Sequence, residues 1–256
     1  MPSKKLRRKT FLKKFGSHAI VNVDPRHVEY YSGTKFPTTK DLRLKLRRAP
    51  SVIHFAVARL ILDNIEEYVV PEKYFVQGKP LEDINKYKKV SDFILNMESP
   101  EKSIWFSILM NKLESCGIAI HKNYRMRSRE EILKFLNSYR DNVVKSIMRK
   151  GFLETYTGWE STGIIDASGC IRKTASGDHR FFIARESRVT SFPLKVVGIH
   201  EDWVRNFQKE SAPLHEAVHD SLSATREKYS TKNSSNIARA SERTLPRDST
   251  GGIGAP

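Results

Sequence analysis

The stretch Thr174-Ala-Ser-Gly-Asp-His-Arg-Phe-Phe-Ile-Ala-Arg185 decides the fold, because it predicts a short strand, a tight glycine turn and the start of a helix. Backbone N–H groups at a helix N-terminus lack intrahelical partners, and they suit a phosphate where a glycine lets the chain approach closely. Asp178, His179 and Arg180 follow that glycine directly, and residues 181–184 supply an apolar face that anchors the helix. The segment therefore predicts an anion site at the helix start.

The chain has 256 residues, enough for one sizeable core, and carries a net charge of +16. Basic side chains crowd residues 4–14, so we expect residues 1–17 to form a flexible basic arm that binds nucleic acid, an anionic membrane surface or an acidic partner. Two cysteines, Cys116 and Cys170, are too few for a disulfide framework. The longest apolar stretch, residues 52–62, is too short to span a bilayer. We expect a cytoplasmic protein with no transmembrane segment.

The expected elements follow one another in an order typical of an α+β protein. Strands are expected over residues 18–23, 163–166, 170–174 and 192–199, and helices over 51–68, 83–96, 102–116, 128–150, 178–187 and within 208–229. The helix over 128–150 has the clearest signals, because Ser128 and Glu131 form a capping box and Gly151 ends it. Residues 32–50 are expected to be a loop, and the polar residues 230–256 a disordered tail.

This order of elements, with the Ser176-Gly-Asp-His-Arg180 box, resembles the ParB/sulfiredoxin superfamily, whose hallmark is a Gly-x-His-Arg or Gly-Glu-Arg-Arg box at a helix start. The resemblance also rests on Val21-Asn-Val-Asp24-Pro25 and on the helix that ends in residues 144–151. Residues 193–203 are similar to ParB-like proteins of unknown function. The resemblance implies that residues 18–207 form a small mixed sheet with flanking helices and a helical insertion at residues 32–127.

In that superfamily the box holds nucleotide phosphates, so the resemblance implies that Ser176, Gly177, His179 and Arg180 contact ATP, ADP or CTP. Sulfiredoxins carry a nucleophilic cysteine where Asp178 stands here. The partition proteins follow their box with a helix-turn-helix domain, and none is evident in this sequence. Free-serine kinases have a closer box and use a glutamate near the first strand as general base, which implies that role for Glu29.

Phosphoryl transfer to a small hydroxyl acceptor requires anion recognition, charge neutralisation and a base on the acceptor. We expect Gly177 and the helix N-terminus to supply the first, and Arg180 and His179 the second. Asp178 or Glu29 is expected to supply the base. The sequence thus predicts a kinase-like transferase or a nucleotide hydrolase.

Other roles remain open for the carboxylates and for one more histidine. Asp178 can instead bind Mg²⁺ beside phosphate oxygens, or only cap the helix while Arg180 pairs with a neighbouring acid. Asp24 is a carboxylate as available as Glu29. His200 ends a predicted strand and can face the same cleft.

Two alternative functions have sequence support. The basic segment 4–14 also fits a ParB-like nucleic-acid-binding protein, DNA-binding included, or a nuclease. His215-Glu-Ala-Val-His219 matches the zinc-protease pattern, in which two histidines on one helix face bind Zn²⁺ and Glu216 acts as base. Asp220 argues against a protease, because it puts a charge where those enzymes bury an apolar residue.

Overall fold

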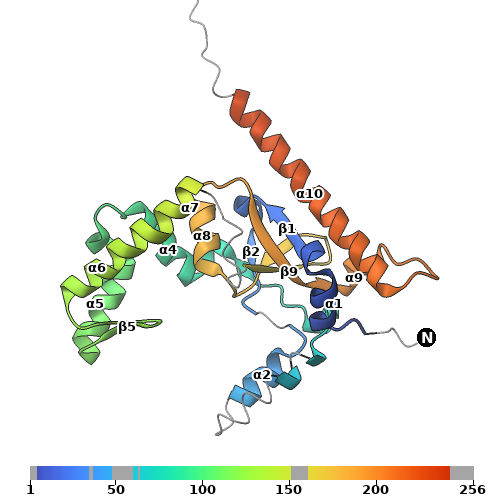
Figure 1. The fold of residues 1–256 in the computed structure, drawn as a ribbon, viewed down its shortest axis with the longest axis horizontal. Coiled ribbons are helices and arrows are strands. Elements are labelled where there is room, and N and C mark those ends of the chain that lie inside the picture. Colours follow the sequence, from blue (N-terminus) through green and yellow to red (C-terminus); the bar gives the residue numbers. More distant parts are fainter. Residues whose placement is uncertain (1–4, 35–36, 48–59, 63, 151–160, 243–256) are drawn as a thin grey trace, which may run out of the picture.

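The computed structural model describes residues 5–34, 37–47, 60–62, 64–150 and 161–242, and shows a mixed sheet with flanking helices (Figure 1). The expected α+β class is therefore confirmed. The strands are β1 (Ile20–Val23), β2 (Tyr30–Tyr31), β3 (Val69–Val70), β4 (Lys79–Pro80), β5 (Ala119–His121), β6 (Tyr124–Met126), β7 (Thr162–Ile165), β8 (Ile171–Lys173) and β9 (Phe192–His200). The main helices are α1 (Arg8–Phe15), α2 (Lys40–Arg47), α4 (Asn85–Leu95), α5 (Ile104–Cys116), α6 (Arg129–Tyr139), α7 (Lys145–Lys150), α8 (Asp178–Glu186), α9 (Glu201–Arg205) and α10 (Leu214–Glu242).

Strand β9 is the longest strand of the main sheet and pairs with three others, and its later residues are all buried. β1 pairs antiparallel with its first half, while β7 and β3 pair with it in parallel. β8 continues the sheet antiparallel to β7, β2 lies parallel to β8, and β4 pairs antiparallel with β2. Lys173, the last residue of β8, lies opposite Gly163 near the start of β7. Helix α8 therefore begins at the end of the sheet where β7 starts, whereas His200 leaves β9 at the other end.

Helices α4, α5 and α6 and the β5–β6 hairpin form a group beside the sheet, with α8 between that group and the strands (Figure 1). Trp105 is the largest fully buried side chain in this group, and it packs edge-on against Phe93, Phe135 and Tyr139. Burying an aromatic side chain of this size stabilises the folded protein by about 3–5 kcal/mol relative to alanine. This aromatic cluster fixes the helices that face the start of α8.

The expected flexible arm is wrong for the residues that the structure describes. Residues 8–15 form α1, and Phe11 is buried against Tyr68, with ring centroids 4.2 Å apart. Arg7 donates to the carbonyl of Ile65, and Lys5 pairs with Glu67 at 3.1 Å. This segment packs on the protein despite its charge, because its lysines and arginines lie on one face of the helix and its apolar residues pack through the other.

The expected helical insertion over residues 32–127 is also corrected. Strands β3 and β4 lie within it, and both pair with strands of the main sheet. Helix α2 was not expected, since residues 32–50 were predicted to be a loop, and the β5–β6 hairpin lies in a segment for which no strand was predicted. Of the helix predicted over 51–68, residues 48–59 and 63 lie outside the described residues, and residues 60–62 and 64–65 are helical.

The C-terminal helix is longer than expected, because α10 runs from Leu214 to Glu242 and so includes part of the predicted disordered tail. Ala217, Val218, Leu222 and Tyr229 are buried and hold its first half on the molecule. Extending a helix that is already nucleated costs far less than starting one, so the polar residues beyond Tyr229 can continue it. Residues 243–256 of the predicted tail lie outside the described residues.

Candidate functional site

The loop before α8 depends on a glycine. Gly177 is the N-cap of α8 and has φ +66°, in the left-handed region that favours glycine. A Cβ on Gly177 would lie 2.6 Å from Cα of Ser161, so no larger residue fits. The Ser161 hydroxyl donates to the carbonyls of Ser176 and Gly177 at 3.3 and 3.2 Å. Gly177 has no side chain that could cap the helix, and the N-terminus of α8 is the positive end of its dipole, which favours an anion.

Asp178 is buried, and both of its carboxylate oxygens accept hydrogen bonds. Lys173 donates to one oxygen at 3.2 Å, while Lys86 and the Tyr31 hydroxyl donate to the other at 2.7 and 3.0 Å. Burial raises the pKa of Asp178, but the two lysines lower it overall below its ordinary value. These contacts contradict the expected capping role, since the carboxylate bonds lysines and a tyrosine rather than the helix. They also occupy the oxygens that a base or a Mg²⁺ ligand would use.

The hydrogen bonds of the Lys173 side chain stabilise the loop before α8. Its side chain is fully buried, and its ammonium donates to the carbonyls of Thr174 and Ser176 as well as to Asp178. A buried ammonium is tolerated only where it is paired and hydrogen-bonded, and here it gains both. Lys173 and Asp178 thus join the two ends of the loop, and Ser176 takes part through its backbone carbonyl.

His179 follows Asp178 and points into the aromatic cluster of the neighbouring helices. Its Nδ1 lies 3.2 Å from the Tyr139 hydroxyl, and its ring lies 5.8 Å from that of His121, at an interplanar angle of 22°. Burial, followed by the charges of Lys89 and Lys122, lowers the pKa of His179 to about 3. His179 is therefore neutral near pH 7.

Four lysines surround the two histidines. Burial and the charges of Lys89, Lys122 and Lys112 lower the pKa of His121 to about 4, and Lys86 adds to the effect on His179. Lys89 lies over the Trp105 ring at 4.4 Å, and burial lowers the pKa of its ammonium to about 8. Among the described residues, Lys89, Lys112 and Lys122 form no ion pair with a carboxylate. We call the group of Lys86, Lys89, Lys112, Lys122, His121 and His179 the cationic cluster.

Arg180 is half-buried on the next position of α8. Burial raises the pKa of the Tyr139 hydroxyl, and the charge of Arg180 opposes that rise. His179 and Arg180 lie in the first turn of α8, directly after the Gly177 turn.

Glu29 and Asp24 do not lie at the start of α8. Tyr31 lies beside Lys173 in a parallel pair, so Glu29 precedes the start of β2, on the side where β8 begins. Glu29 is exposed. Burial raises the pKa of Tyr229, with a smaller contribution from the charge of Glu29, and Tyr229 accepts a hydrogen bond from the N–H of Ile171 at that end of β8. Asp24 caps the short turn after β1 and pairs with Arg26. Burial raises the pKa of Asp24, and the Arg26 contacts lower it overall.

His200 lies at the opposite end of the sheet from Gly177, so the expected shared cleft is wrong. Its Nδ1 accepts the N–H of Asp202 at 3.1 Å and caps α9, while Nε2 bonds the Glu72 carboxylate. Glu72, His200 and Asp202 are the one group in the described part of the chain that has three metal-ligating atoms within 4.8 Å of one another. Both ring nitrogens of His200 already have partners, so the group is explained by structural contacts.

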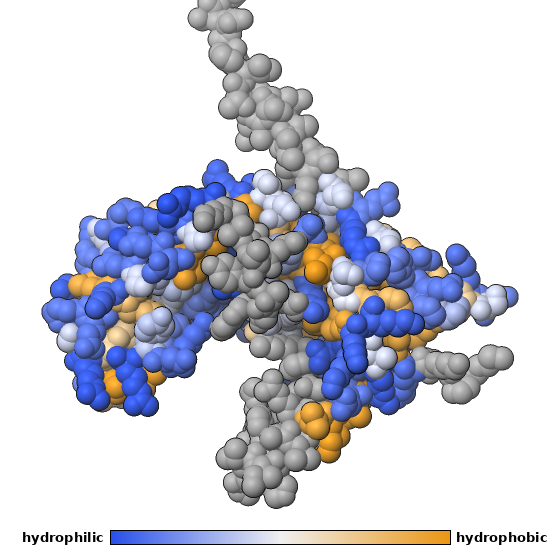
Figure 2. Space-filling view, viewed as in Figure 1, coloured by the Kyte–Doolittle hydropathy of each residue, from blue (hydrophilic) through white to orange (hydrophobic). Residues whose placement is uncertain are grey.

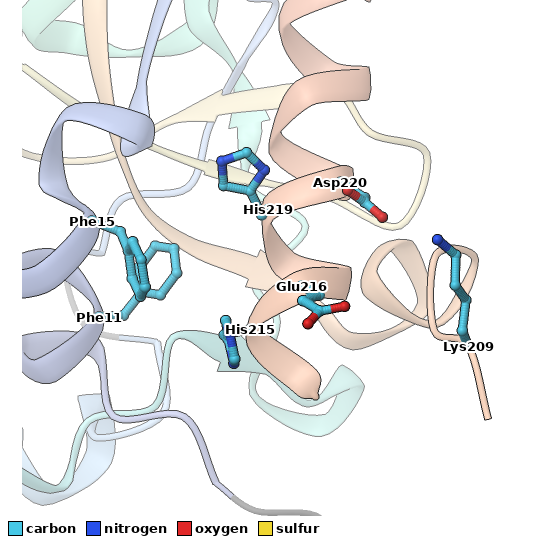
Figure 3. A pocket seen from close by; sticks show the side chains of 7 residues that line it. All are labelled: Phe11, Phe15, Lys209, His215, Glu216, His219 and Asp220. Carbon is cyan, nitrogen blue, oxygen red and sulfur yellow. The ribbon is translucent and has the colours of Figure 1, made fainter. Parts of the chain in front are cut away.

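His215 and His219 lie on the side of α10 that faces α1, in a pocket of about 390 Å³ (Figure 3). His215 stacks on Phe15 at 6.1 Å, and the His219 ring lies 5.0 Å from that of His18. Asp220 projects from the other side of the helix. Within the described ranges, no group of three metal-ligating atoms that lie within 4.8 Å of one another includes His215 and His219. Phe15 occupies the position beside His215 instead.

The comparisons give no relative for this chain: no protein-family description, curated protein or solved structure matches it. None of the helices that the structure describes combines the length and the apolar character needed to cross a membrane.

The lysines that make the site cationic have little signal in the sequence. Lys86 and Lys89 share one face of α4 at a spacing of three residues, and this spacing was the one local signal available. Lys112, His121 and Lys122 come from a helix end and a hairpin whose position depends on tertiary packing.

Proposed function

We propose that this protein binds a nucleotide, with its phosphates between the start of α8 and the cationic cluster. The observation that carries the proposal is the set of three lysines, Lys89, Lys112 and Lys122, that surround two neutral histidines without a described carboxylate partner. Positive charge without a described carboxylate partner, beside the N-terminus of a helix, favours an anion. The nucleotide, rather than a simple phosphate, is supported by the resemblance of the Gly177–Arg180 box to the ParB/sulfiredoxin superfamily.

The chemistry proposed for this site is phosphoryl transfer to a hydroxyl acceptor, or nucleotide hydrolysis. His179 is neutral near pH 7, and the negative charge of a bound phosphate raises its pKa from about 3 toward the range in which a general base works, whereas Asp178 is held by two lysines and a tyrosine. We therefore assign the base to His179 and the shaping of the loop to Asp178. Asp178 does not fit a Mg²⁺ ligand, because Lys173, Lys86 and Tyr31 bond both of its carboxylate oxygens.

Calorimetry with ATP, ADP, CTP and pyrophosphate tests binding. We expect the double variant His179→Ala, Lys89→Met to bind its best ligand at least about tenfold more weakly, because a hydrogen bond to a charged group contributes about 1.5–3 kcal/mol. Lys209→Met is the matched control, since Lys209 is an exposed lysine on the α10 pocket. Equal affinity in the double variant and the control would remove the site.

Turnover of the bound nucleotide with candidate hydroxyl acceptors tests the chemistry. His179→Ala is expected to abolish turnover, while Asp178→Asn lowers it through a less stable loop and reduces thermal stability in parallel. A variant Asp178→Asn that keeps its melting temperature but loses all turnover would return the role of base to Asp178.

A further inference from the structure

His179 lies among aromatic rings that fix the orientation of its imidazole. The Trp105 ring meets it edge-on at a centroid distance of 5.5 Å, and the His121 ring lies nearly parallel to it. The Tyr139 ring stands almost perpendicular to it, at 6.1 Å and an interplanar angle of 87°. The visible surface of helices α4, α5 and α6 is largely hydrophilic, with small apolar patches, whereas Trp105 is buried (Figure 2). Packing therefore leaves the imidazole few other orientations.

The two ring nitrogens of His179 have different surroundings. Nδ1 lies 3.2 Å from the Tyr139 hydroxyl, within hydrogen-bond distance. In the part of the chain that the structure describes, Nε2 makes no hydrogen bond. His179 is the second residue of α8, directly beside the proposed phosphate site. Nε2 is therefore the nitrogen that is free to exchange a proton with a bound molecule.

The partner of Nδ1 decides which nitrogen carries the single proton of the neutral ring. A tyrosine hydroxyl can donate or accept a hydrogen bond, so Tyr139 is compatible with either tautomer. If Tyr139 donated to Nδ1, the ring proton would lie on Nε2, and Nε2 could not act as a base. With the Tyr139 oxygen as acceptor, Nδ1 carries the proton and Nε2 keeps its lone pair.

Two features favour the Tyr139 oxygen as the acceptor. A histidine that acts as a base becomes an imidazolium, in which both nitrogens are donors, so an acceptor at Nδ1 serves the ring before and after the proton transfer. A hydroxyl that donated to Nδ1 would have to turn away first. Burial and the surrounding lysine charges oppose a second proton on this ring, and an acceptor at Nδ1 offsets part of that opposition.

We propose that Tyr139 is a positioning residue for His179: the Nδ1–H of His179 donates to the Tyr139 oxygen and leaves the Nε2 lone pair to take the proton of the acceptor. The inference rests on the proposed function, in which His179 is the base. As the acceptor oxygen bonds to phosphorus, its O–H bond breaks and an N–H bond forms at Nε2. The P–O bond to the leaving nucleotide breaks, and the nucleotide keeps its electron pair. Tyr139 keeps its own proton throughout.

Proton–nitrogen correlation NMR of the free protein identifies the tautomer, because protonated and unprotonated ring nitrogens have well-separated chemical shifts. His179→Gln assigns the signals, and we expect Nδ1 to carry the proton in the wild-type protein. Tyr139→Phe removes only the hydroxyl and should move the ring toward the Nε2-protonated form, which histidine prefers in water. Tyr87→Phe is the matched control, since it removes a half-buried hydroxyl that bonds Glu186, and it should leave the tautomer unchanged.

A wild-type ring protonated on Nε2 would overturn the proposal, and so would a Tyr139→Phe protein with the wild-type tautomer. In turnover assays we expect Tyr139→Phe to lower kcat by about 2- to 10-fold at unchanged KM, the range for one hydrogen bond, and Tyr87→Phe to change neither. Because the tautomer is measured without nucleotide, a failure to bind nucleotide would remove the proposed function alone. Turnover by a protein with the proton on Nε2 would instead remove only the role of Tyr139.

Discussion

Gly177 and Gly117 have almost the same backbone conformation but different surroundings. Both have φ near +67°, yet a Cβ on Gly177 meets the Ser161 backbone at 2.6 Å, while a Cβ on Gly117 meets nothing within 4 Å. We expect Gly117→Ala to lower the free energy of unfolding by about 1 kcal/mol, the cost of the left-handed conformation. Gly177→Ala should cost roughly 1–3 kcal/mol more through strain. Urea denaturation measures both, and equal losses would contradict the close contact with Ser161.

Lys89 gives the nucleotide site its own pH dependence. Its pKa is about 8 in the free protein, so the ammonium is charged at pH 7 and loses its proton well below the ordinary lysine value. A phosphate ester is fully ionised above pH 7.5, so a fall in affinity between pH 7.5 and 9 reports on the protein. We expect nucleotide affinity to fall by up to about tenfold over that range, and Lys89→Arg to remove the fall, since arginine stays charged. Calorimetry at both pH values measures this, and identical wild-type and Lys89→Arg profiles would contradict it.

At the scale of elements, α1 belongs to the core despite its charge. Phe11 is 2% exposed and contacts the fully buried Tyr68. We expect Phe11→Ala to lower the free energy of unfolding by about 3–5 kcal/mol, as for other buried phenylalanines. Thr10→Ala, at an exposed position of the same helix, is the control and should change it by less than about 0.5 kcal/mol. Urea denaturation that gave the same midpoint for both variants would show that the helix is only loosely attached.

Elements with complete local signals could be predicted from the sequence, and elements that depend on partners could not. The Ser128 hydroxyl accepts the N–H of Glu131 at the start of α6, and Gly117 ends α5 in the left-handed conformation, as expected. The π-helical turn Arg140–Val144 between α6 and α7 had no such signal. β3 and β4 have two residues each, and they form because β9 and β2 offer free edges. Such short strands leave no periodic pattern to detect.

The residues of the candidate site also divide into those with a local sequence signal and those whose position depends on tertiary partners. Gly177, His179 and Arg180 are adjacent in sequence, so the local pattern of a turn before a helix brings them together. Glu29 was assigned to the site from the family resemblance, and His200 because it ends a predicted strand. The registers of β2 and β9 place both residues away from the start of α8. The contacts of Asp178 could be predicted only in part. Its two lysine partners come from β8 and α4, and nothing in the local sequence indicates the contact from α4.

At the scale of the whole molecule, the direction of the strands keeps two groups of titratable residues apart. The cationic cluster and the Gly177 turn lie at the end where β7 starts, and Glu72, His200 and Asp202 lie at the end where β9 finishes. The sheet thus separates the cationic cluster from the carboxylates of Glu72 and Asp202. Burial and the lysine charges lower the pKa values of the two histidines in the cluster, and this makes global stability sensitive to acid.

The histidines of the cluster set the direction of that sensitivity. The folded pKa values of His179 and His121, about 3 and about 4, lie below the unfolded value of 6.5. Between pH 6.5 and pH 4 the unfolded chain therefore binds more protons, and the free energy of unfolding decreases as pH falls. Each histidine adds a slope of at most about 1.4 kcal/mol per pH unit, with less from the half-exposed His121 because water screens its charge.

We expect urea denaturation at pH 7, 5.5 and 4.5 to give a steady loss of stability in the wild-type protein. The variant His121→Gln, His179→Gln should start from a lower stability at pH 7 and decline less steeply, since it removes both protonation steps. A saturating nucleotide should offset the loss, because a bound phosphate stabilises the protonated histidines and shifts the folding equilibrium by mass action. Parallel declines in wild type and variant would show that the cationic cluster does not suppress histidine protonation, and the electrostatic basis of the nucleotide site would then have to be abandoned.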